Sequence, residues 1–149
     1  MTEVRFYHLL HRSLEDILPP MLEMTLERGW RAVVMAGSRQ RVEALNQHLW
    51  TYRKDSFLPH AAAAEGEAAY QPVWLTDRDE NPNGANVLFL TDGAVSERSA
   101  DYARVCELFD GNDADAVSAA RGHWKRYKDA GHELSYWQQT GRGGWERKA

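Results

Sequence analysis

Hydrophobic positions along the chain change repeatedly between strand-like and helix-like spacing, which predicts alternating strands and helices. Val4–Leu10 is short and rich in β-forming residues, so it indicates an opening strand. Arg31–Ala36 is an apolar run after a glycine, typical of a buried parallel strand. Apolar residues at helical spacing then predict an amphipathic helix over residues 39–50, with Ser38 as its N-cap. Strand, helix, strand and helix in this order predict an α/β layer fold.

The first helix of this pattern has two prolines in an awkward place. Ser13 is a plausible N-cap, with Asp16 near the helix N-terminus, and Gly29 marks the end. Pro19 and Pro20 fall inside the apolar stripe, where proline removes a backbone hydrogen bond. The helix therefore either starts near Pro20 or is kinked there, and we expect the late start.

The second half of the chain continues the strand and helix signals. Three further strands are expected at Pro72–Leu75, Asn86–Leu90 and Arg104–Phe109. The segment Ala61–Ala69 is expected to be a loop or a weak helix, and Asp77–Gly84 a turn. A last helix is predicted from a cap at Asp113 or Asp115 through Ala130. We expect one domain over residues 1–137 and a flexible C-terminal tail over residues 138–149.

Composition narrows the class of protein. The 149 residues suffice for a single core, with 43% hydrophobic and 27% charged residues. The net charge of −4 argues against coating nucleic acid by bulk charge. The single cysteine, Cys106, excludes an internal disulfide. The N-terminus lacks the pattern of a signal peptide and no run is long enough for a membrane helix, so we expect a cytoplasmic protein.

A search for catalytic or metal-binding motifs gives no positive result. The turn at Gly37-Ser38 has one glycine and no Gly-Lys-Ser/Thr, so capping is its expected use. His8 and His11 have no further ligand at metal-binding spacing. Cys106 lies in a predicted strand and is expected to be a small buried hydrophobe. We expect no enzymatic activity, no metal and no cofactor. The alternative is an α/β nucleotide- or phosphate-binding enzyme domain acting from the Gly37-Ser38 turn.

The segment Leu49–His60 is rich in large aromatic residues near a loop. Trp50 ends the second predicted helix, and Phe57 follows after a short charged connector. Such residues either seal the rim of the core or form an exposed anchor for a partner. The sequence leaves both interpretations open.

The last predicted helix carries the most basic stretch of this acidic protein. Arg121, Lys125 and Lys128 share one helix face, and Trp124 neighbours it; Arg126 is the fourth cation. One interpretation is a buried apolar stripe, formed by Val117, Ala120, Trp124 and Tyr127, with solvated cations. The other is a cationic, aromatic-edged surface for an anionic peptide or a C-terminal carboxylate. Direct nucleic-acid binding is a third possibility, which the net charge disfavours.

Motifs in the middle of the chain have the order and spacing of a known family. Leu49-Trp50 precedes Ser56-Phe57-Leu58-Pro59-His60, and the small, acidic stretch Ala64-Glu65-Gly66 follows. A proline-containing strand, Gln71–Leu75, and an apolar strand, Asn86–Leu90, come next. In this order, the segments resemble the chi subunit of bacterial DNA polymerase III.

The last helix extends the resemblance to the chi subunit. The family closes with a helix that carries an arginine, an aromatic-lysine pair and a terminal Ala-Gly, matched by Arg121, Trp124-Lys125 and Ala130-Gly131. The similarity runs from Phe6 to about Trp137. It implies a single-domain, Rossmann-like three-layer α/β fold, with helices on both sides of a mostly parallel sheet and no nucleotide chemistry.

The resemblance also implies two partners. Chi subunits link the clamp loader to single-stranded DNA-binding protein, whose acidic C-terminal tail ends in a phenylalanine carboxylate. By position, the tail-binding residues are Arg121, Trp124, Lys125, Arg126 and Lys128. Trp50 and Phe57 mark the surface for the psi subunit or a competing helicase. The family thus implies a place in the replisome on the nucleoid, with only indirect contact with DNA.

Overall fold

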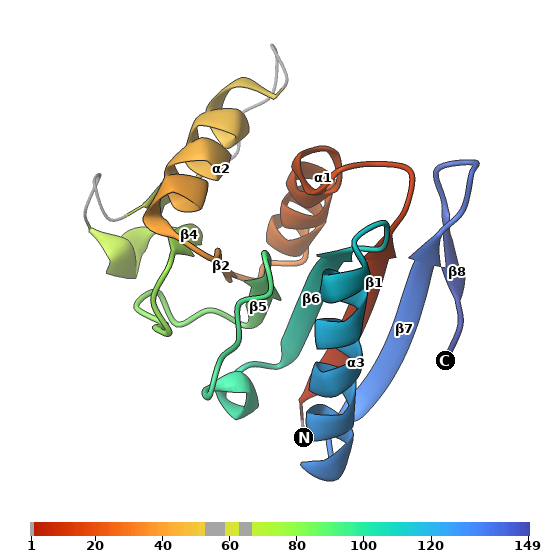
Figure 1. Cartoon of the computed structure of the whole chain (residues 1–149). Coiled ribbons are helices and arrows are strands. Elements are labelled where there is room, and N and C mark those ends of the chain that lie inside the picture. Colours follow the sequence, from red (N-terminus) through yellow and green to blue (C-terminus); the bar gives the residue numbers. More distant parts are fainter. Residues whose placement is uncertain (1, 53–58, 63–66) are drawn as a thin grey trace.

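The apolar runs of the sequence form one central sheet in the computed structural model, which describes residues 2–52, 59–62 and 67–149 (Figure 1). The strands are β1 (Glu3–Leu9), β2 (Ala32–Met35), β3 (Ala61–Ala62), β4 (Val73–Thr76), β5 (Val87–Leu90), β6 (Arg104–Asp110), β7 (Glu133–Gln139) and β8 (Trp145–Arg147). The α-helices are α1 (Leu14–Glu27), α2 (Arg39–Thr51) and α3 (Ala114–Asp129). Short 3₁₀ helices lie at Ala68–Tyr70 and Ser99–Asp101.

The strands are arranged in the order β3-β4-β2-β5-β6-β1-β7-β8. All neighbouring strands run parallel except β7 and β8, which pair antiparallel. The predicted α/β fold with a mostly parallel, Rossmann-like sheet is confirmed. The long strands β1 and β6 lie side by side near the centre, so their carboxyl ends meet at one edge of the sheet.

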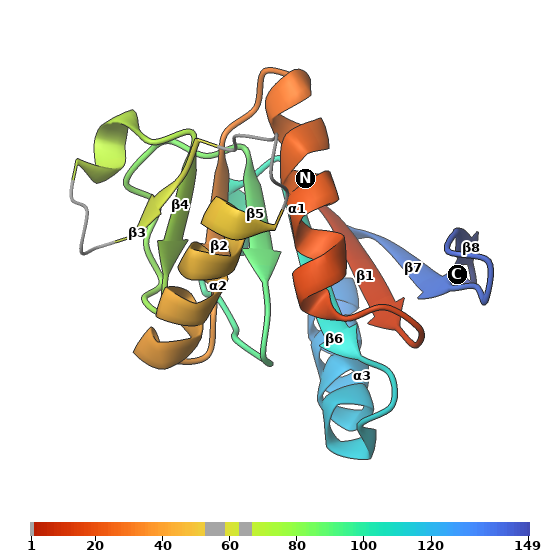
Figure 2. The same cartoon turned by 90° about the horizontal axis from the view of Figure 1, so that it is seen from above.

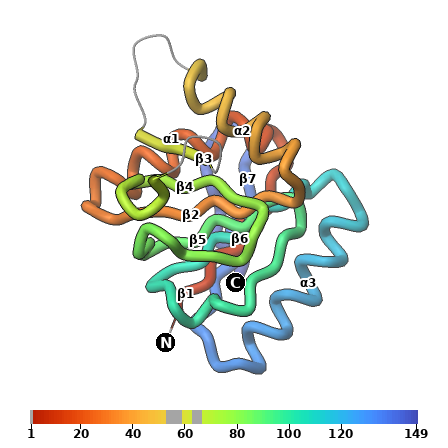
Figure 3. The backbone as a smooth tube through the Cα atoms, turned by 90° about the vertical axis from the view of Figure 1, so that its left-hand side faces the viewer, coloured from red at the N-terminus to blue at the C-terminus, as the bar shows by residue number. Residues whose placement is uncertain are grey.

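Helices cover both faces of the sheet (Figure 3). One core cluster packs α1 and α2 against the sheet, and the other packs α3 against the opposite face. The strand β2 is buried along its whole length because its side chains alternate between these two cores; Val34 points into the first and Val33 into the second. Figure 2 shows α1 and α2 together on one side of the sheet.

The helix α1 runs through both prolines, so the predicted late start near Pro20 is wrong. Ser13 caps the helix as expected: its Oγ accepts from the Asp16 N–H at 3.3 Å. Pro19 has no N–H for the Glu15 carbonyl, four residues earlier. His48 Nε2 of α2 donates to that carbonyl at 2.6 Å. A tertiary contact thus satisfies the group that the proline leaves without a helical partner.

Two further expectations differ from the structure. Ala61 and Ala62 form β3, which pairs with β4, in a segment where we expected a loop or a weak helix. Trp145–Arg147 forms β8, in a segment where we expected no regular structure. Trp145 packs on Tyr7 with ring centroids 5.1 Å apart, so an apolar contact fixes this strand to the sheet. Among the described residues, no helix combines the length and apolar character needed to cross a bilayer.

Candidate functional site

The helix α3 carries the predicted cationic site. Asp113 is its N-cap, with Oδ1 accepting from the Asp115 and Ala116 amides at 2.9 and 3.4 Å. The four cations are exposed, and none of them forms an ion pair with a carboxylate in the described part of the chain. The N-cap thus fixes the start of a helix whose second half presents unpaired positive charge.

The cations of α3 lie on two different flanks of the helix. At 3.6 residues per turn, Arg121, Lys125 and Lys128 fall within about 60° of its circumference. Arg126 lies about 140° from Arg121 on the same projection. We call Arg121, Trp124, Lys125 and Lys128 the α3 patch. The helix therefore unites four of the five predicted tail-binding residues and separates Arg126 from them.

Trp124 is the aromatic member of the α3 patch and is half-buried. Its ring meets Phe6 of β1 edge-on at 5.3 Å and Tyr136 of β7 at 5.9 Å. Ala120 and Tyr127 are buried beside it in the same core cluster. Trp124 therefore packs on the core and still leaves part of its ring on the surface, so both interpretations of this helix stay open.

Arg121 lies close enough to His8 and Tyr136 to affect their titration. Partial burial lowers the pKa of His8, and the positive charge of Arg121 acts in the same direction. Burial raises the pKa of Tyr136, and Arg121 opposes this effect. The Tyr136 hydroxyl and His8 Nδ1 form a 2.6 Å hydrogen bond. Sequence reasoning missed both residues as neighbours of the site, because Tyr136 lies in a strand that the pattern did not predict.

The other flank of α3 faces a buried carboxylate. Glu107 of β6 is 3% exposed, and both of its oxygens lie 2.9 Å from His123 Nδ1. Burial raises the pKa of Glu107, while the His123 hydrogen bond and the charge of Arg126 lower it. Arg126 thus lies toward Glu107. In the sequence, Glu107 stands out as a charged residue within the apolar strand β6, which indicates a buried carboxylate that needs a partner.

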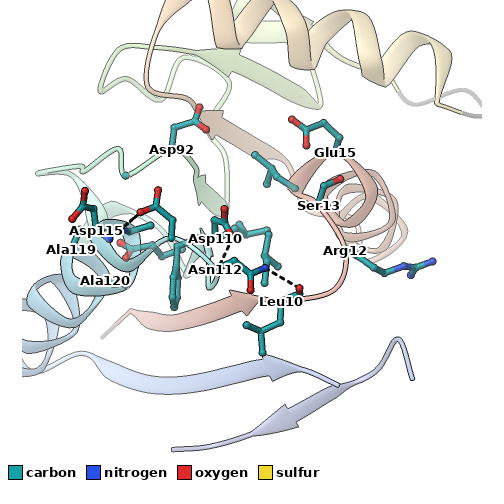
Figure 4. Close-up of a pocket in the computed structure, with 18 of the residues that line it drawn as sticks. Leu10, Arg12, Ser13, Glu15, Asp92, Asp110, Asn112, Asp115, Ala119 and Ala120 are labelled. Carbon is teal, nitrogen blue, oxygen red and sulfur yellow. Dashed lines mark hydrogen bonds between the residues drawn. The ribbon is translucent and has the colours of Figure 1, made fainter. Parts of the chain in front are cut away.

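A cleft of about 720 Å³ lies at the carboxyl ends of β1 and β6 (Figure 4). Open α/β sheets often bind ligands at this edge. Its lining carboxylates are Glu15, Asp92, Glu107, Asp110, Asp113 and Asp115. Arg41 pairs with two of them at 3.1 Å, Glu15 and Asp92, and Asp113 caps α3. A cleft so rich in carboxylates disfavours nucleotides and other polyanions.

The turn considered for phosphate binding is occupied by the protein itself. Asp92 has a left-handed φ of 56° and accepts from the Gly37 N–H at 3.2 Å. A Cβ built on Gly37 would lie 3.0 Å from the Asp92 Cβ, so the two segments approach closely. Ser38 caps α2 through the Arg41 N–H at 3.2 Å, the expected use. These contacts do not favour the nucleotide- or phosphate-binding alternative.

The second predicted surface is described only in part. Trp50 lies at the end of α2 and is 44% exposed. Its ring centroid is 4.4 Å from that of His60, which is buried. Phe57, the other predicted residue, lies outside the described residues. The structure therefore shows a partly exposed aromatic ring at Trp50.

The cysteine and histidines show no catalytic or metal-binding arrangement in residues 2–52, 59–62 and 67–149. Cys106 is buried, and burial raises the pKa of its thiol to about 12. No three His, Cys, Asp or Glu side chains gather there in a way that could hold a metal ion.

Comparison with known proteins identifies the family. The model of the DNA polymerase III chi subunit family, HolC, matches residues 1–135. The chain is also 29% identical over 108 residues to a probable DNA polymerase III subunit chi from Rickettsia prowazekii (strain Madrid E). That match covers 70% of this chain and 66% of the relative, just under two thirds of its length. The chain belongs to the DNA polymerase III chi subunit family.

Proposed function

We propose that this protein is a non-enzymatic accessory subunit of the DNA polymerase III clamp loader. In this proposal it acts in the cytoplasm at the replisome and binds the acidic C-terminal tail of single-stranded DNA-binding protein. The observation that carries the proposal is the α3 patch: three exposed cations, without an ion pair among the described residues, beside a half-buried tryptophan on a chain of the chi family.

The chemistry of the α3 patch matches such a tail. Arginine binds a carboxylate through two parallel hydrogen bonds, so Arg121 suits the terminal carboxylate. Lys125 and Lys128 supply point charges for the acidic side chains that precede it. Trp124 and Tyr136 offer aromatic edges to the phenylalanine ring of the tail. Because both side chains already pack against Phe6, binding costs them less conformational entropy.

The tail hypothesis is tested by titrating the purified protein with a peptide that copies the tail. We expect micromolar affinity, about −8 kcal/mol. Removal of the terminal phenylalanine should abolish binding, since the aromatic contact is lost and the new terminal carboxylate is displaced by one residue from its position at Arg121. Arg121→Ala and Lys125→Ala should each weaken it. If all three changes leave the affinity equal to that of the wild-type protein for the full-length peptide, the α3 patch is rejected as the tail site.

We infer a second partner surface at Trp50 from its 44% exposure and its place in the family motif. Exposed tryptophans at the centre of an interface often dominate its binding energy. The candidate partner is the psi subunit or a helicase that competes for the same surface. In pull-downs from lysate, Trp50→Ala should lose this partner and keep single-stranded DNA-binding protein. Arg121→Ala should lose single-stranded DNA-binding protein and keep the second partner.

A further inference from the structure

A groove lies between α1 and the β7–β8 hairpin, on the sheet face opposite α3. It encloses about 450 Å³. One wall is the apolar side of α1, with Met21 and Met24; the other is formed by Trp137 and Trp145. Met24 is 69% exposed, the mark of an apolar side chain without a covering partner in the described chain. Methionine-lined surfaces adapt readily to the apolar side chains of a partner.

The charged side chains that line the groove are all positive in the described part of the chain. Four arginines line it, Arg5, Arg12, Arg28 and Arg104, and no Asp or Glu of the described residues does. Glu3, next to the groove, bonds Arg104 at 2.7 Å and Arg5 at 3.0 Å. Burial raises the pKa of Glu3, but the bonds from Arg104 and Arg5 outweigh it and lower that pKa. Glu3 thus pairs with two of the four arginines and offsets one of their two positive charges.

The other two arginines are available to an incoming anion. Neither Arg12 nor Arg28 has an ion pair within the described residues. The Arg28 guanidinium stacks over the Trp30 ring at 4.1 Å, which orients it without neutralising it. In Figure 4 the Arg12 side chain points away from the carboxylates of the cleft. In a protein of net charge −4, this groove is a local site for negative charge.

The two arginines flank the ends of α1. Arg12 comes just before the helix and Arg28 just after it. The 14 residues of α1 span about 21 Å, the length of roughly six to seven residues of an extended chain. Positive charge therefore stands at both ends of an apolar groove of peptide length.

We propose that this groove binds a peptide segment of a partner protein whose apolar middle is flanked by acidic residues. Its apolar side chains contact Met21, Met24 and the two tryptophans, and its carboxylates contact Arg12 and Arg28. Two available cations are few for a nucleic acid, which carries a charge at every nucleotide and is bound chiefly through phosphates. The aliphatic wall of α1 likewise suits side chains better than bases.

The groove is independent of the α3 patch. Trp137 and Trp145 pack with the core that contains α1, whereas Trp124 and Tyr136 pack with the other core. The family model ends at residue 135, so both tryptophans of the groove wall follow the segment that the family model covers. The groove is thus completed by a hairpin that begins at the end of the matched region and lies mostly beyond it.

The test uses two synthetic peptides with the same apolar middle, Leu-Phe-Leu-Leu, and either Asp-Glu or Lys-Lys pairs at both ends. Titrations of the isotope-labelled full chain follow the indole N–H signals of its tryptophans, assigned by single Trp→Phe changes. We expect the acidic peptide to shift the signals of Trp30, Trp137 and Trp145 and to leave those of Trp50 and Trp124 in place. The lysine peptide should bind about tenfold more weakly or not at all.

Met24→Glu places a carboxylate in the groove without disturbing the core, and Arg28→Ala removes one cation. Each substitution should lower the affinity for the acidic peptide about tenfold. Val95→Glu, at another exposed apolar residue, is the matched control and should bind as the wild type does. The proposal is overturned if the acidic peptide causes no shifts, or if both peptides bind equally. It is also overturned if an oligothymidylate binds the groove more tightly than the acidic peptide.

Discussion

At the scale of single residues, the least expected group is the buried Glu107 carboxylate. It lies in the middle of β6, where the neighbouring side chains are apolar, and His123 is its hydrogen-bonding partner at 2.9 Å. A buried carboxylate is costly unless it is paired or protonated. The pair links β6 to the flank of α3 that is opposite to Arg121, and so helps to fix the helix that carries the α3 patch.

We predict that Glu107→Gln gains stability relative to the wild type as the pH rises. Burial raises the folded pKa of Glu107 above its ordinary value of 4.5. Its contribution to stability is therefore fully present below the unfolded pKa and is lost as the pH rises through the folded pKa. Urea unfolding of both proteins over a pH series measures the difference. A difference that is constant, or that changes in the opposite direction, would contradict the assigned burial.

A second prediction compares the stability of alanine substitutions at Gly111 and at Gly122, which serves as the control. A Cβ on Gly111 would overlap the His8 ring and lie 2.8 Å from the Leu9 carbonyl oxygen, whereas nothing lies within 4 Å of one on Gly122. Gly111→Ala should therefore lower the free energy of unfolding by roughly 1–3 kcal/mol.

Gly122→Ala, inside α3, should raise the free energy of unfolding by roughly 0.5–1 kcal/mol. Thermal or urea unfolding compares both variants with the wild type. A Gly111→Ala protein as stable as the wild type would show that the turn after β6 does not approach His8 and Leu9 of β1 as closely as described.

The residues of the α3 patch illustrate what spacing reveals and what it misses. The common face of Arg121, Lys125 and Lys128 follows from helical periodicity alone. Their neighbours His8 and Tyr136 do not, because the parallel pairing of β1 with β7 brings together residues 128 positions apart. Local sequence patterns carry no signal for that contact.

At the scale of secondary-structure elements, α1 shows how a tertiary contact overrides local propensity. Pro19 removes the hydrogen bond to the Glu15 carbonyl, and His48 of α2 replaces it. The sequence could predict the cap at Ser13 but not this bond, since it depends on the packing of α2 beside α1. The same limitation applies to β8, whose position depends on the contact between Trp145 and Tyr7.

We predict that the effect of His48 on stability depends on Pro19. His48→Ala should destabilise the wild type by roughly 1–3 kcal/mol, because the Glu15 carbonyl is left without a protein partner. In a Pro19→Ala background the loss should be smaller, since the substituted residue has a backbone N–H that can bond to that carbonyl.

A double-mutant cycle of unfolding free energies measures the coupling between the two positions. Equal losses in both backgrounds would show that His48 does not compensate for the proline.

At the scale of the whole molecule, the fold was largely predictable, because its strands are short apolar runs and its helices have polar caps. The pattern predicted β1, β2, β4, β5 and β6 and the helices α2 and α3 near their observed bounds. It could not predict the strand order, in which β1 lies between β6 and β7, because that order follows from long-range packing. The two sheet faces consequently carry different surfaces, the α3 patch on one and the α1 groove on the other.

Binding of the acidic tail of single-stranded DNA-binding protein by the α3 patch can be tested on single arginines. Arg121 and Arg126 offer a matched pair for it, since they are the same residue type on the same helix, on different flanks. Calorimetric titration of Arg121→Ala and Arg126→Ala with the tail peptide is the most direct measurement. We expect Arg121→Ala to weaken binding about tenfold or more and Arg126→Ala to change it less than about threefold. Equal losses from the two substitutions, or a larger loss from Arg126→Ala, would contradict it.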